Sequence, residues 1–292
     1  MKRRQFIQLA SLGILTGGLV PSRAVLARKS FLKMGIFPRR NPKATYLMFT
    51  PLANMLSRQL GINVVLQTTK DFASFWRNVE NQRYDLVHFN QYHYLVANKY
   101  YGYQAVAMLE ETGSSTISGA VIVRDDSGID SVEQLKGKKI IFGGGKKAMQ
   151  SYIVPKWLLK KNGLDESQFY SEFARNPPNA LISVYQNLAD AAGSGDAALQ
   201  MNQVKNAIDT SQLRILLQSE PMAHLPWAIS DRIDRELFDE IKSALVTLDQ
   251  SPEGVEVLKT ANLTNIISAD HDDYAYALEI IQEIYGETLG IN

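Results

Sequence analysis

The chain has 292 residues, of which 45% are hydrophobic and 21% charged, and its formal net charge is +1. This composition is typical of a globular protein with one large domain or two lobes, and the near-neutral charge without a Lys/Arg-rich run argues against a nucleic-acid binder. Cysteine is absent, which excludes disulfides, thiolate metal sites, cysteine nucleophiles and a lipidated N-terminal cysteine.

The first 27 residues have the pattern of an export signal. Lys2-Arg3-Arg4 precede the apolar stretch 6–20, and Val25 and Ala27 stand at the small-residue spacing of a signal-peptidase site. We expect cleavage near Ala27 and a periplasmic mature protein with a charge of about −3, because residues 1–27 hold four basic and no acidic residues. The paired arginines resemble a twin-arginine signal, and an uncleaved membrane anchor is the alternative.

From Phe31 onward, short strand-like runs alternate with longer amphipathic segments. The expected strands are FLKMGIF (31–37), INVVLQT (62–68) and YDLVHFN (84–90), and the expected helices are TYLMFTPLANMLSRQLG (45–61) and DFASFWRNVENQ (71–82). Strands alternating with helices of this length predict right-handed βαβ units and a mainly parallel sheet. The run SSTISGAVIVRDD (114–126) interrupts the rhythm, and we interpret it as the crossing into a second lobe.

The second half repeats the α/β pattern. Asp130 or Ser131 is expected to cap a short helix, and GKKIIFG (137–143) is a strand that leads to a helix over about 148–161. Further expectations are a helix at NALISVYQNLADA (179–191), a strand at GDAALQM (195–201), a helix at NQVKNAI (202–208), a strand at LRILLQS (213–219), and closing helices at RELFDEIKSALVTL (235–248) and DDYAYALEIIQEIYG (272–286).

The segment Gly143-Gly144-Gly145-Lys146-Lys147-Ala148, hereafter the glycine-lysine loop, joins a predicted strand to a predicted helix. Such a junction gathers backbone N–H groups and the positive helix end, which suits an anion. It is not a nucleotide P-loop, because Ile140 and Lys147 replace the first glycine and the hydroxyl residue, and no G-x-G-x-x-G is present, so no dinucleotide cofactor is expected. The alternative is a simple tight turn with solvated lysines.

The stretch GIDSVEQLKGKKIIFGGGKKAMQSYIVPKWLLKKNGLD (128–165) resembles type II periplasmic solute-binding proteins, and among them the phosphonate/phosphite/phosphate-binding components of ABC transporters. The resemblance extends over nearly the whole mature chain. It implies a two-lobed α/β fold, each lobe a mainly parallel sheet flanked by helices, with two inter-lobe crossings and a ligand between the lobes. The implied division is signal peptide 1–27, lobe 1 over 28–115 and 222–292, and lobe 2 over 116–221.

Several ligand positions of that family are changed here. Ala148, Met149 and Gln150 stand where the family has a Ser-Thr-Ser run that grips the oxyanion, and Phe72 and Ile117 stand near two tyrosine positions. Family members that bind an amino group on the ligand use two acidic residues for it. The corresponding positions fall near Asn202-Gln203 and Leu225, so neither carboxylate is present here. The resemblance therefore implies a small oxyanion or carboxylated solute rather than an aminoalkylphosphonate.

Candidate ligand residues come from four places. Those of the loop and the following helix are Gly144, Gly145, Lys146, Lys147, Ala148, Gln150 and Ser151, and those of lobe 1 are Phe72, Asn90, Tyr92 and His93. The crossings and lobe 2 add Ser115, Thr116, Ser118, Gln203 and His224. Ligand loops follow strand ends in open α/β sheets, which supports Asn90, Tyr92 and His93, although a buried aromatic helix face would give the same pattern. Phe72 is a candidate through the family resemblance.

Neither a metal site nor an enzyme is indicated. The four histidines are scattered, and neither a G-x-S-x-G elbow nor an H-E-x-x-H helix occurs. We expect a monomeric, non-enzymatic binding protein without cofactor that captures an anionic small molecule and delivers it to an ABC permease in the inner membrane. Two alternatives remain at this point: a ligand-sensing partner of a membrane sensor kinase, and an enzyme resembling the thiamine-pyrimidine synthesis branch of the same fold.

Overall fold

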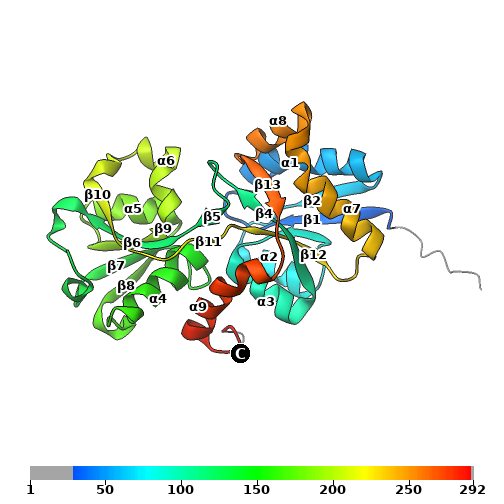
Figure 1. The fold of residues 1–292 in the computed structure, drawn as a ribbon. Helices are drawn as coiled ribbons and strands as arrows, with labels where there is room; N and C mark the ends of the chain where they lie inside the picture. Colours follow the sequence, from blue (N-terminus) through cyan, green and yellow to red (C-terminus); the bar gives the residue numbers. More distant parts are fainter. Residues whose placement is uncertain (1–28, 291–292) are drawn as a thin grey trace, which may run out of the picture.

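A computed structural model describes residues 29–290, which fold around two β-sheets placed side by side (Figure 1). The predicted export signal lies outside the described residues. Within the described residues, no helix is both long and apolar enough to span a membrane.

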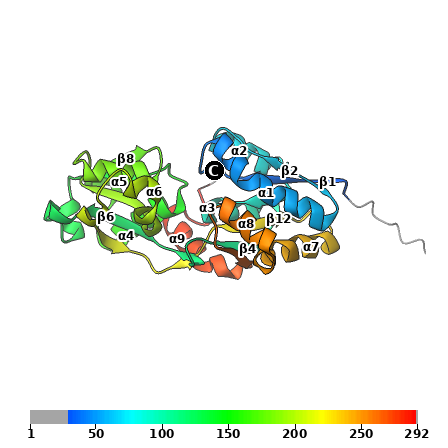
Figure 2. The ribbon, with the colours of Figure 1, turned by 90° about the horizontal axis from the view of Figure 1, so that it is seen from above.

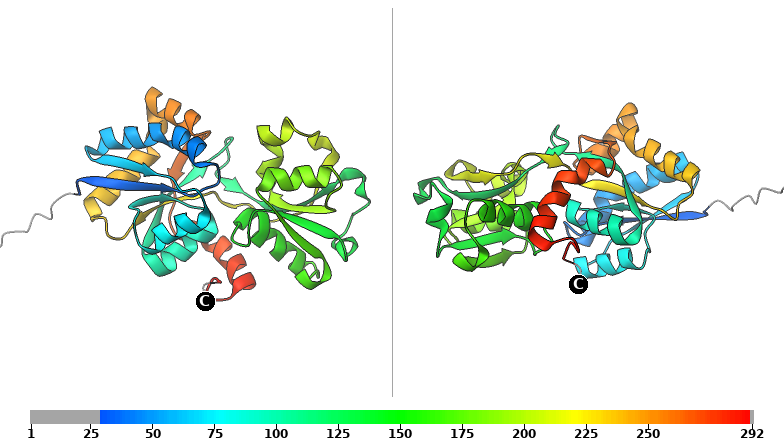
Figure 3. Two further views of the ribbon diagram at one scale, coloured as in Figure 1. Left: turned by 180° about the vertical axis from the view of Figure 1, so that it is seen from behind. Right: turned by 60° about the horizontal axis from the view of Figure 1, so that its bottom comes forward.

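The first sheet has six strands in the order β13-β4-β12-β3-β1-β2. Strand β1 is parallel to β2 and β3, whereas β12 is antiparallel to β3 and β4, and β13 is antiparallel to β4. Its elements are β1 (Phe31–Ile36), α1 (Pro42–Leu60), β2 (Asn63–Gln67), α2 (Phe72–Glu80), β3 (Leu86–His88), α3 (Gln91–Tyr101), β4 (Tyr103–Glu110), β12 (Pro226–Ser230), α7 (Arg235–Val246), α8 (Pro252–Thr260) and β13 (Asn265–Ser268). Strand β1 runs from the outer edge of this lobe toward the other lobe (Figures 1 and 3).

The helices of this lobe begin where the sequence supplies capping side chains. Asn41, Asp71 and Asn90 each accept a backbone N–H from the residue three positions later, and so begin α1, α2 and α3. Gly61 and Gly102 end α1 and α3 in the left-handed conformation that glycine adopts without strain. The caps fix the starts of the three helices at the ends of β1, β2 and β3 that point toward the second lobe.

The second sheet has five strands in the order β10-β6-β9-β7-β8. Strands β7, β8 and β9 are parallel, and β6 and β10 are antiparallel to their neighbours. Its elements are β6 (Gly119–Arg124), β7 (Lys139–Gly143), a π-helix (Met149–Ile153), α4 (Val154–Lys161), β8 (Tyr170–Ala174), α5 (Pro177–Tyr185), β9 (Ala191–Gly195), α6 (Asn202–Lys205) and β10 (Leu213–Gln218).

Two short strands, β5 (Thr116–Ile117) and β11 (Met222–Ala223), pair antiparallel where the chain passes between the sheets. The last helix, α9 (Ala275–Tyr285), contacts α3 of the first lobe and α4 of the second. It lies between the two lobes in Figures 2 and 3. Trp157 Nε1 on α4 donates to Glu283 Oε2 on α9 at 2.9 Å. The two lobes are therefore connected by the strand pair and by the C-terminal helix.

Most predicted elements are found, with differences in the second lobe. The predicted strand GDAALQM (195–201) is wrong: residues 196–200 form a 3-10 turn, and the strand is β9, whose sequence is AAGSG. The predicted helix 179–191 correspondingly ends at Tyr185. Strand β9 is buried throughout and packs closely, since a Cβ on Gly193 would lie 2.4 Å from the Phe142 ring. Small residues leave room for this packing but lack the β-branched signal by which strands are recognised.

Candidate functional site

The glycine-lysine loop leaves β7 at the end that faces the first lobe. Gly143 ends the strand against Pro177, where a Cβ would lie 2.5 Å from the proline Cα, and Gly144 adopts φ +131°. L residues with a side chain rarely adopt that φ angle. Steric constraints therefore explain the glycine at both positions. The loop then enters the π-helix, whose first residues Met149, Gln150 and Ser151 are buried.

The loop presents N–H groups that have no acceptor in the described part of the chain. Ala148 N bonds to Gly145 O at 2.8 Å, and Gly144 N to Phe142 O at 2.9 Å. Among described residues, no acceptor is found for the amides of Gly145, Lys146 and Lys147. Free N–H groups before a helix, together with the helix dipole, favour a negative charge at this point.

Gln150 is the most informative side chain of this region. It is 9% exposed, and neither its Nε2 nor its Oε1 has a hydrogen-bond partner within residues 29–290. Its Cβ lies over Gly195 at the end of β9, 3.4 Å from where a Cβ of that glycine would be. Buried amides are nearly always hydrogen-bonded, so this side chain has capacity for both a donor and an acceptor contact with a ligand.

The loop contacts the first lobe directly. Asn90 Nδ2, at the start of α3, donates to the carbonyl oxygen of Lys147 at 3.2 Å. Tyr285 Oη on α9 donates to the carbonyl oxygen of Lys146 at 2.5 Å. The glycine-lysine loop is therefore placed at the boundary between the lobes and not on the outer surface.

The two lysines of the loop interact with different residues, although the sequence analysis predicted both as ligand residues. Burial and, less strongly, the positive charge of Lys147 lower the pKa of His93 to about 3, and the backbone carbonyl of Lys147 accepts from Asn90 of the first lobe. Against the opposing effect of burial, the pKa of Glu166 in the second lobe is lowered by Lys156, by Tyr152 and, least, by Lys146. The charge of Lys147 thus acts on a residue of the first lobe, and that of Lys146 on a residue of its own lobe.

His93 belongs to a row of three aromatic rings at the boundary edge of lobe 1, formed by Phe37, Phe72 and His93. Phe72 stacks on His93 with centroids 5.3 Å apart and planes at 19°, and its ring is 6.1 Å from that of Phe37. Phe72 is 41% exposed, whereas His93 is 3% exposed. His93 Nδ1 lies 2.8 Å from Asn90 Oδ1, an acceptor, so the neutral ring carries its proton on Nδ1.

Behind this row, buried histidines connect lobe 1 to the crossings. His224 N donates to Ser115 O, its Nδ1 accepts from Leu225 N at 2.8 Å, and its Nε2 lies 3.9 Å from Glu111 Oε2. Burial lowers the pKa of His224 to about 4, although the Glu111 carboxylate opposes this. His88 stacks on Trp227 with centroids 5.0 Å apart, and burial lowers its pKa to about 3.

Sequence reasoning did not identify Arg39 and Arg40, which follow β1 at the same edge. Arg39 Nη1 pairs with Glu111 Oε1 at 3.0 Å. Arg40 lines a small pocket of about 10 Å³ together with Ile36, Phe37, Arg39, Thr45, Phe49 and His88. That volume accommodates about one water molecule. The signal was available, because the rule that selected Asn90, a polar residue just after a parallel strand, applies equally to Arg39 and Arg40.

The remaining predicted residues lie apart from the loop or have structural partners. Tyr92 is buried and donates to Leu289 O at 2.9 Å, which places its hydroxyl on the C-terminal segment. Thr116 is exposed on β5, with its hydroxyl 3.3 Å from that of Ser114. Ser118 is buried, and its backbone N bonds to Asp196 Oδ1 at 3.2 Å. Gln203 is exposed on α6, whose main contacts are with α5 and the 3-10 turn 196–200.

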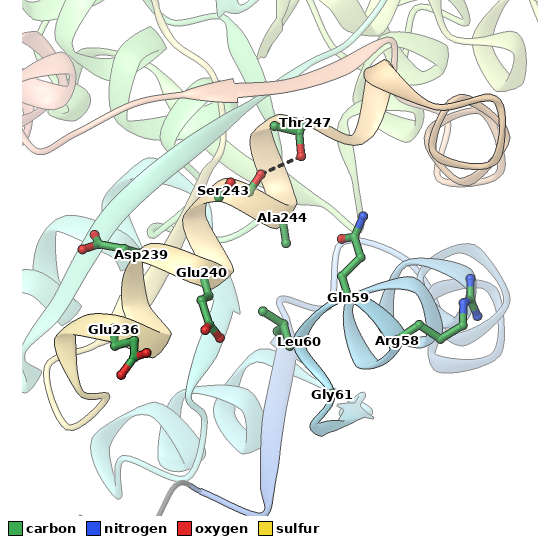
Figure 4. Close-up of a pocket in the computed structure, with 10 residues that line it drawn as sticks. All are labelled: Arg58, Gln59, Leu60, Gly61, Glu236, Asp239, Glu240, Ser243, Ala244 and Thr247. Carbon is green, nitrogen blue, oxygen red and sulfur yellow. Dashed lines mark hydrogen bonds between the residues drawn. The ribbon is translucent and has the colours of Figure 1, made fainter.

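A separate pocket lies between the end of α1 and α7 on the outer part of lobe 1 (Figure 4). Its volume is about 890 Å³, and Glu236, Asp239 and Glu240 of α7 line one side. Three carboxylates make it unfavourable for an anion. Among residues 29–290, no three His, Cys, Asp or Glu side chains gather in a way that could hold a metal ion.

Two α/β lobes joined by paired crossing strands, with an N–H-rich loop of one lobe against the other, define a two-lobed solute-binding protein. A family model described as "ABC transporter, phosphonate, periplasmic substrate-binding protein" matches residues 34–274, and the chain belongs to this family. The family and the two-lobed type II fold predicted from the sequence are thereby confirmed.

Solved structures share this fold. A binding protein component of an ABC phosphonate transporter from Pseudomonas aeruginosa has a TM-score of 0.73 at 16% identity, covering 90% of this chain and 88% of that chain. PhnD1 from Prochlorococcus marinus in complex with methylphosphonate has a TM-score of 0.74 at 18% identity, covering 88% and 99%. A Xanthomonas citri protein bound to ATP has a TM-score of 0.76 at 16% identity, covering 90% and 98%. The protein is thus a substrate-binding component of an ABC transporter.

Proposed function

We propose that this protein is exported to the periplasm as a monomer, binds a phosphonate- or phosphate-type oxyanion between its lobes, and delivers it to an inner-membrane permease. The lobes of this proposal are residues 28–115 with 222–292, and 116–221. The family supports the transport role, and PhnD1, a structural neighbour, was solved with methylphosphonate. The observation that carries the ligand class is the buried amide of Gln150, close in sequence to the N–H groups of the glycine-lysine loop, since neither has a hydrogen-bond partner among residues 29–290.

The loop supplies donors and positive charge for an oxyanion. Backbone N–H groups of Gly145, Lys146 and Lys147, the positive end of the helical segment 149–161 and the Lys147 ammonium all favour negative charge at one place. In other members of the family, a Ser-Thr-Ser run binds the oxyanion through its hydroxyl groups. Here the N–H groups and Lys147 take that role, since Ala148 and Met149 have no hydroxyl.

Gln150 adds selectivity between kinds of oxyanion. Its Nε2 can donate to an anionic oxygen, and its Oε1 needs a donor. A phosphonate that retains one proton supplies such a donor from its P–OH group, whereas a sulfonate has none at neutral pH. A sulfonate would leave Oε1 buried without a partner, which costs about 1–3 kcal/mol.

Binding would operate by a population shift between arrangements of the two lobes. A ligand that touches both the loop and the first lobe favours the arrangement in which they meet, by the difference of its affinity for the two states. The hydrogen bond from Asn90 to Lys147 O belongs to the arrangement seen here.

Calorimetric titration of the purified protein tests this proposal. We expect heat of binding with methylphosphonate, phosphite or phosphate, and weaker binding of methanesulfonate and aminoethylphosphonate. Gln150→Leu should weaken methylphosphonate binding by about tenfold to hundredfold, because it removes hydrogen bonds to a charged group.

The matched control is Gln59→Leu, an exposed glutamine at the outer end of α1 that should leave affinity unchanged. If no phosphorus oxyanion binds, or if methanesulfonate binds as tightly as methylphosphonate, the proposed ligand class is wrong. Equal affinity of the Gln150→Leu variant and the unmodified protein would remove Gln150 from the site.

A further inference from the structure

Arg40 is a guanidinium without a fixed partner at the boundary edge of lobe 1. Its neighbour Arg39 has a carboxylate, since Nη1 lies 3.0 Å from Glu111 Oε1. For Arg40 no hydrogen bond or ion pair is found within residues 29–290. The side chain is partly buried and lines the small pocket over Phe37 and His88. Glu111 is therefore paired with Arg39, and within residues 29–290 no carboxylate is paired with Arg40.

The surroundings of Arg40 add to this positive charge. The chain continues into Asn41, the cap of the 19-residue helix α1, whose positive end lies beside the two arginines. Burial and the charge of Arg39 lower the pKa of Arg40 to about 10, which leaves it protonated at neutral pH. His88 and His224, the titratable groups behind the pocket, have lowered pKa values and are neutral. Glu111 is thus the acidic group that acts on this cation.

A second cation lies at the other end of the aromatic row. The backbone carbonyl of Lys147 accepts from Asn90, whose Oδ1 lies 2.8 Å from His93 Nδ1, and the stacked pair His93 and Phe72 leads through Phe37 to the strand end that carries the arginines. Phe72 is the exposed member of this row. Along the boundary edge, the order is therefore a cation with free N–H groups, an apolar ring surface, and a second cation.

From this order we propose that the ligand carries two anionic groups joined by a short apolar linker. The glycine-lysine loop holds a phosphonate group, the linker lies on Phe72, and Arg40 binds a carboxylate or second phosphoryl group. Arg40 is thus a specificity-determining residue. This inference rests on the proposed function and deepens it by naming the substrate class.

The physical reason is the cost of a desolvated charge. A guanidinium partly removed from water is stabilised by a bidentate carboxylate or phosphoryl group, and these are the partners that its planar fork fits best. A ligand with one anionic group leaves Arg40 unpaired whenever the lobes meet over it. A ligand with a second anion pairs it and gains affinity.

The test compares ligands with the same three-carbon chain, with and without a second anionic group. Phosphonopropionate is titrated against propylphosphonate, with methylphosphonate and glutarate as further probes, into the purified protein and its Arg40→Gln, Arg40→Lys and Arg83→Gln variants. Arg83 is an exposed arginine of the same lobe and is the charge-matched control. Thermal unfolding with each variant identifies any loss of fold.

We expect phosphonopropionate to bind about tenfold or more tightly than propylphosphonate. Arg40→Gln should abolish that ratio, Arg40→Lys should leave it intermediate because an ammonium lacks the bidentate fork, and Arg83→Gln should preserve it. If Arg40→Gln does not fold, the Arg40→Lys variant decides. A ratio of phosphonopropionate to propylphosphonate affinity equal to that of the unmodified protein then overturns the role proposed for Arg40.

The outcomes separate this inference from the proposed function. Binding of methylphosphonate without preference for phosphonopropionate, or a preference that survives Arg40→Gln, overturns the inference and leaves the proposed function. Tight binding of glutarate without binding of methylphosphonate overturns the phosphonate class and supports two anionic groups. Absence of binding by all four probes overturns both.

Discussion

The hydrogen bond between Asn90 and the glycine-lysine loop offers a sharp test of how the lobes meet. Asn90 has two functions on different atoms. Its Oδ1 accepts from His93 N and lies beside His93 Nδ1, each at 2.8 Å, and so caps α3. Its Nδ2 donates to Lys147 O at 3.2 Å. Substitutions can therefore remove the contact between the lobes with or without the cap.

Asn90→Asp keeps the cap, because aspartate is as good an N-cap as asparagine. It removes the donor and places a carboxylate against the carbonyl oxygen of Lys147 and near the proposed anion. We expect the free energy of unfolding to change by less than about 0.5 kcal/mol. The affinity for methylphosphonate should fall about tenfold or more, since a net hydrogen bond of about 1 kcal/mol is lost and a like charge is added.

Asn90→Ala should behave differently. It loses the cap, so the free energy of unfolding should fall by about 0.5–2 kcal/mol. Its affinity should fall by only about twofold to tenfold, because a hydrogen bond is lost without an added charge. The control is Ser251→Ala, which removes the bond from Gly254 N to Ser251 Oγ at 3.0 Å at the start of α8 and should lower stability alone.

Urea unfolding and calorimetric titration measure the two quantities, and small-angle X-ray scattering with and without ligand reports the separation of the lobes. Unchanged methylphosphonate affinity in Asn90→Asp would show that the contact between Asn90 and Lys147 is not part of the ligand-bound arrangement. The reasoning about the loop as a boundary element would then be refuted.

Two further predictions concern stability. Three buried histidines have pKa values lowered to about 3 or 4 (His88, His93 and His224), so between pH 6.5 and about 4 the unfolded chain binds protons that the folded chain does not. Stability should therefore fall with decreasing pH, by about 1.4 kcal/mol per pH unit for each histidine, in urea unfolding followed across this range; a flat profile would contradict their neutral burial. Gly143→Ala should destabilise the fold by roughly 1–3 kcal/mol because its Cβ meets Pro177, whereas Gly145→Ala, with nothing within 4 Å, should be near neutral; equal urea midpoints would refute this account of the loop.

Much of the fold could be predicted from sequence where local signals agree with the tertiary environment. The run FLKMGIF and the capped helix after it correspond to β1 and α1, and GKKIIFG corresponds to β7. Prediction failed at β9, where small residues are required by packing against Phe142 rather than by strand propensity. Strand β8 was missed because it lies at the sheet edge and several of its residues are exposed. Its sequence YSEFA therefore shows little of the apolar alternation by which a strand is recognised.

The candidate site shows the same division. The glycine-lysine loop, Asn90 and His93 were selected from sequence because ligand groups follow strand ends and helix starts, whereas Gln150 and Phe72 were selected from the resemblance to the family. The different surroundings of Lys146 and Lys147 could not be selected in this way, since adjacent residues in a turn point in different directions. Arg39 has a carboxylate partner and Arg40 has none within residues 29–290, and this contrast depends on Glu111, which is distant in sequence.

By itself, then, the sequence determined the alternation of strands and helices, the family, and the loop at which backbone amides and a helix start converge, because periodicity, caps and glycines act over a few residues. Only the tertiary structure decided that Gln150 and Arg40 are among the polar groups without a partner within residues 29–290, and that the charge of Lys147 acts on His93 of the other lobe. Hydrogen-bond satisfaction and burial depend on what distant segments bring to the same place, and no local pattern contains that information.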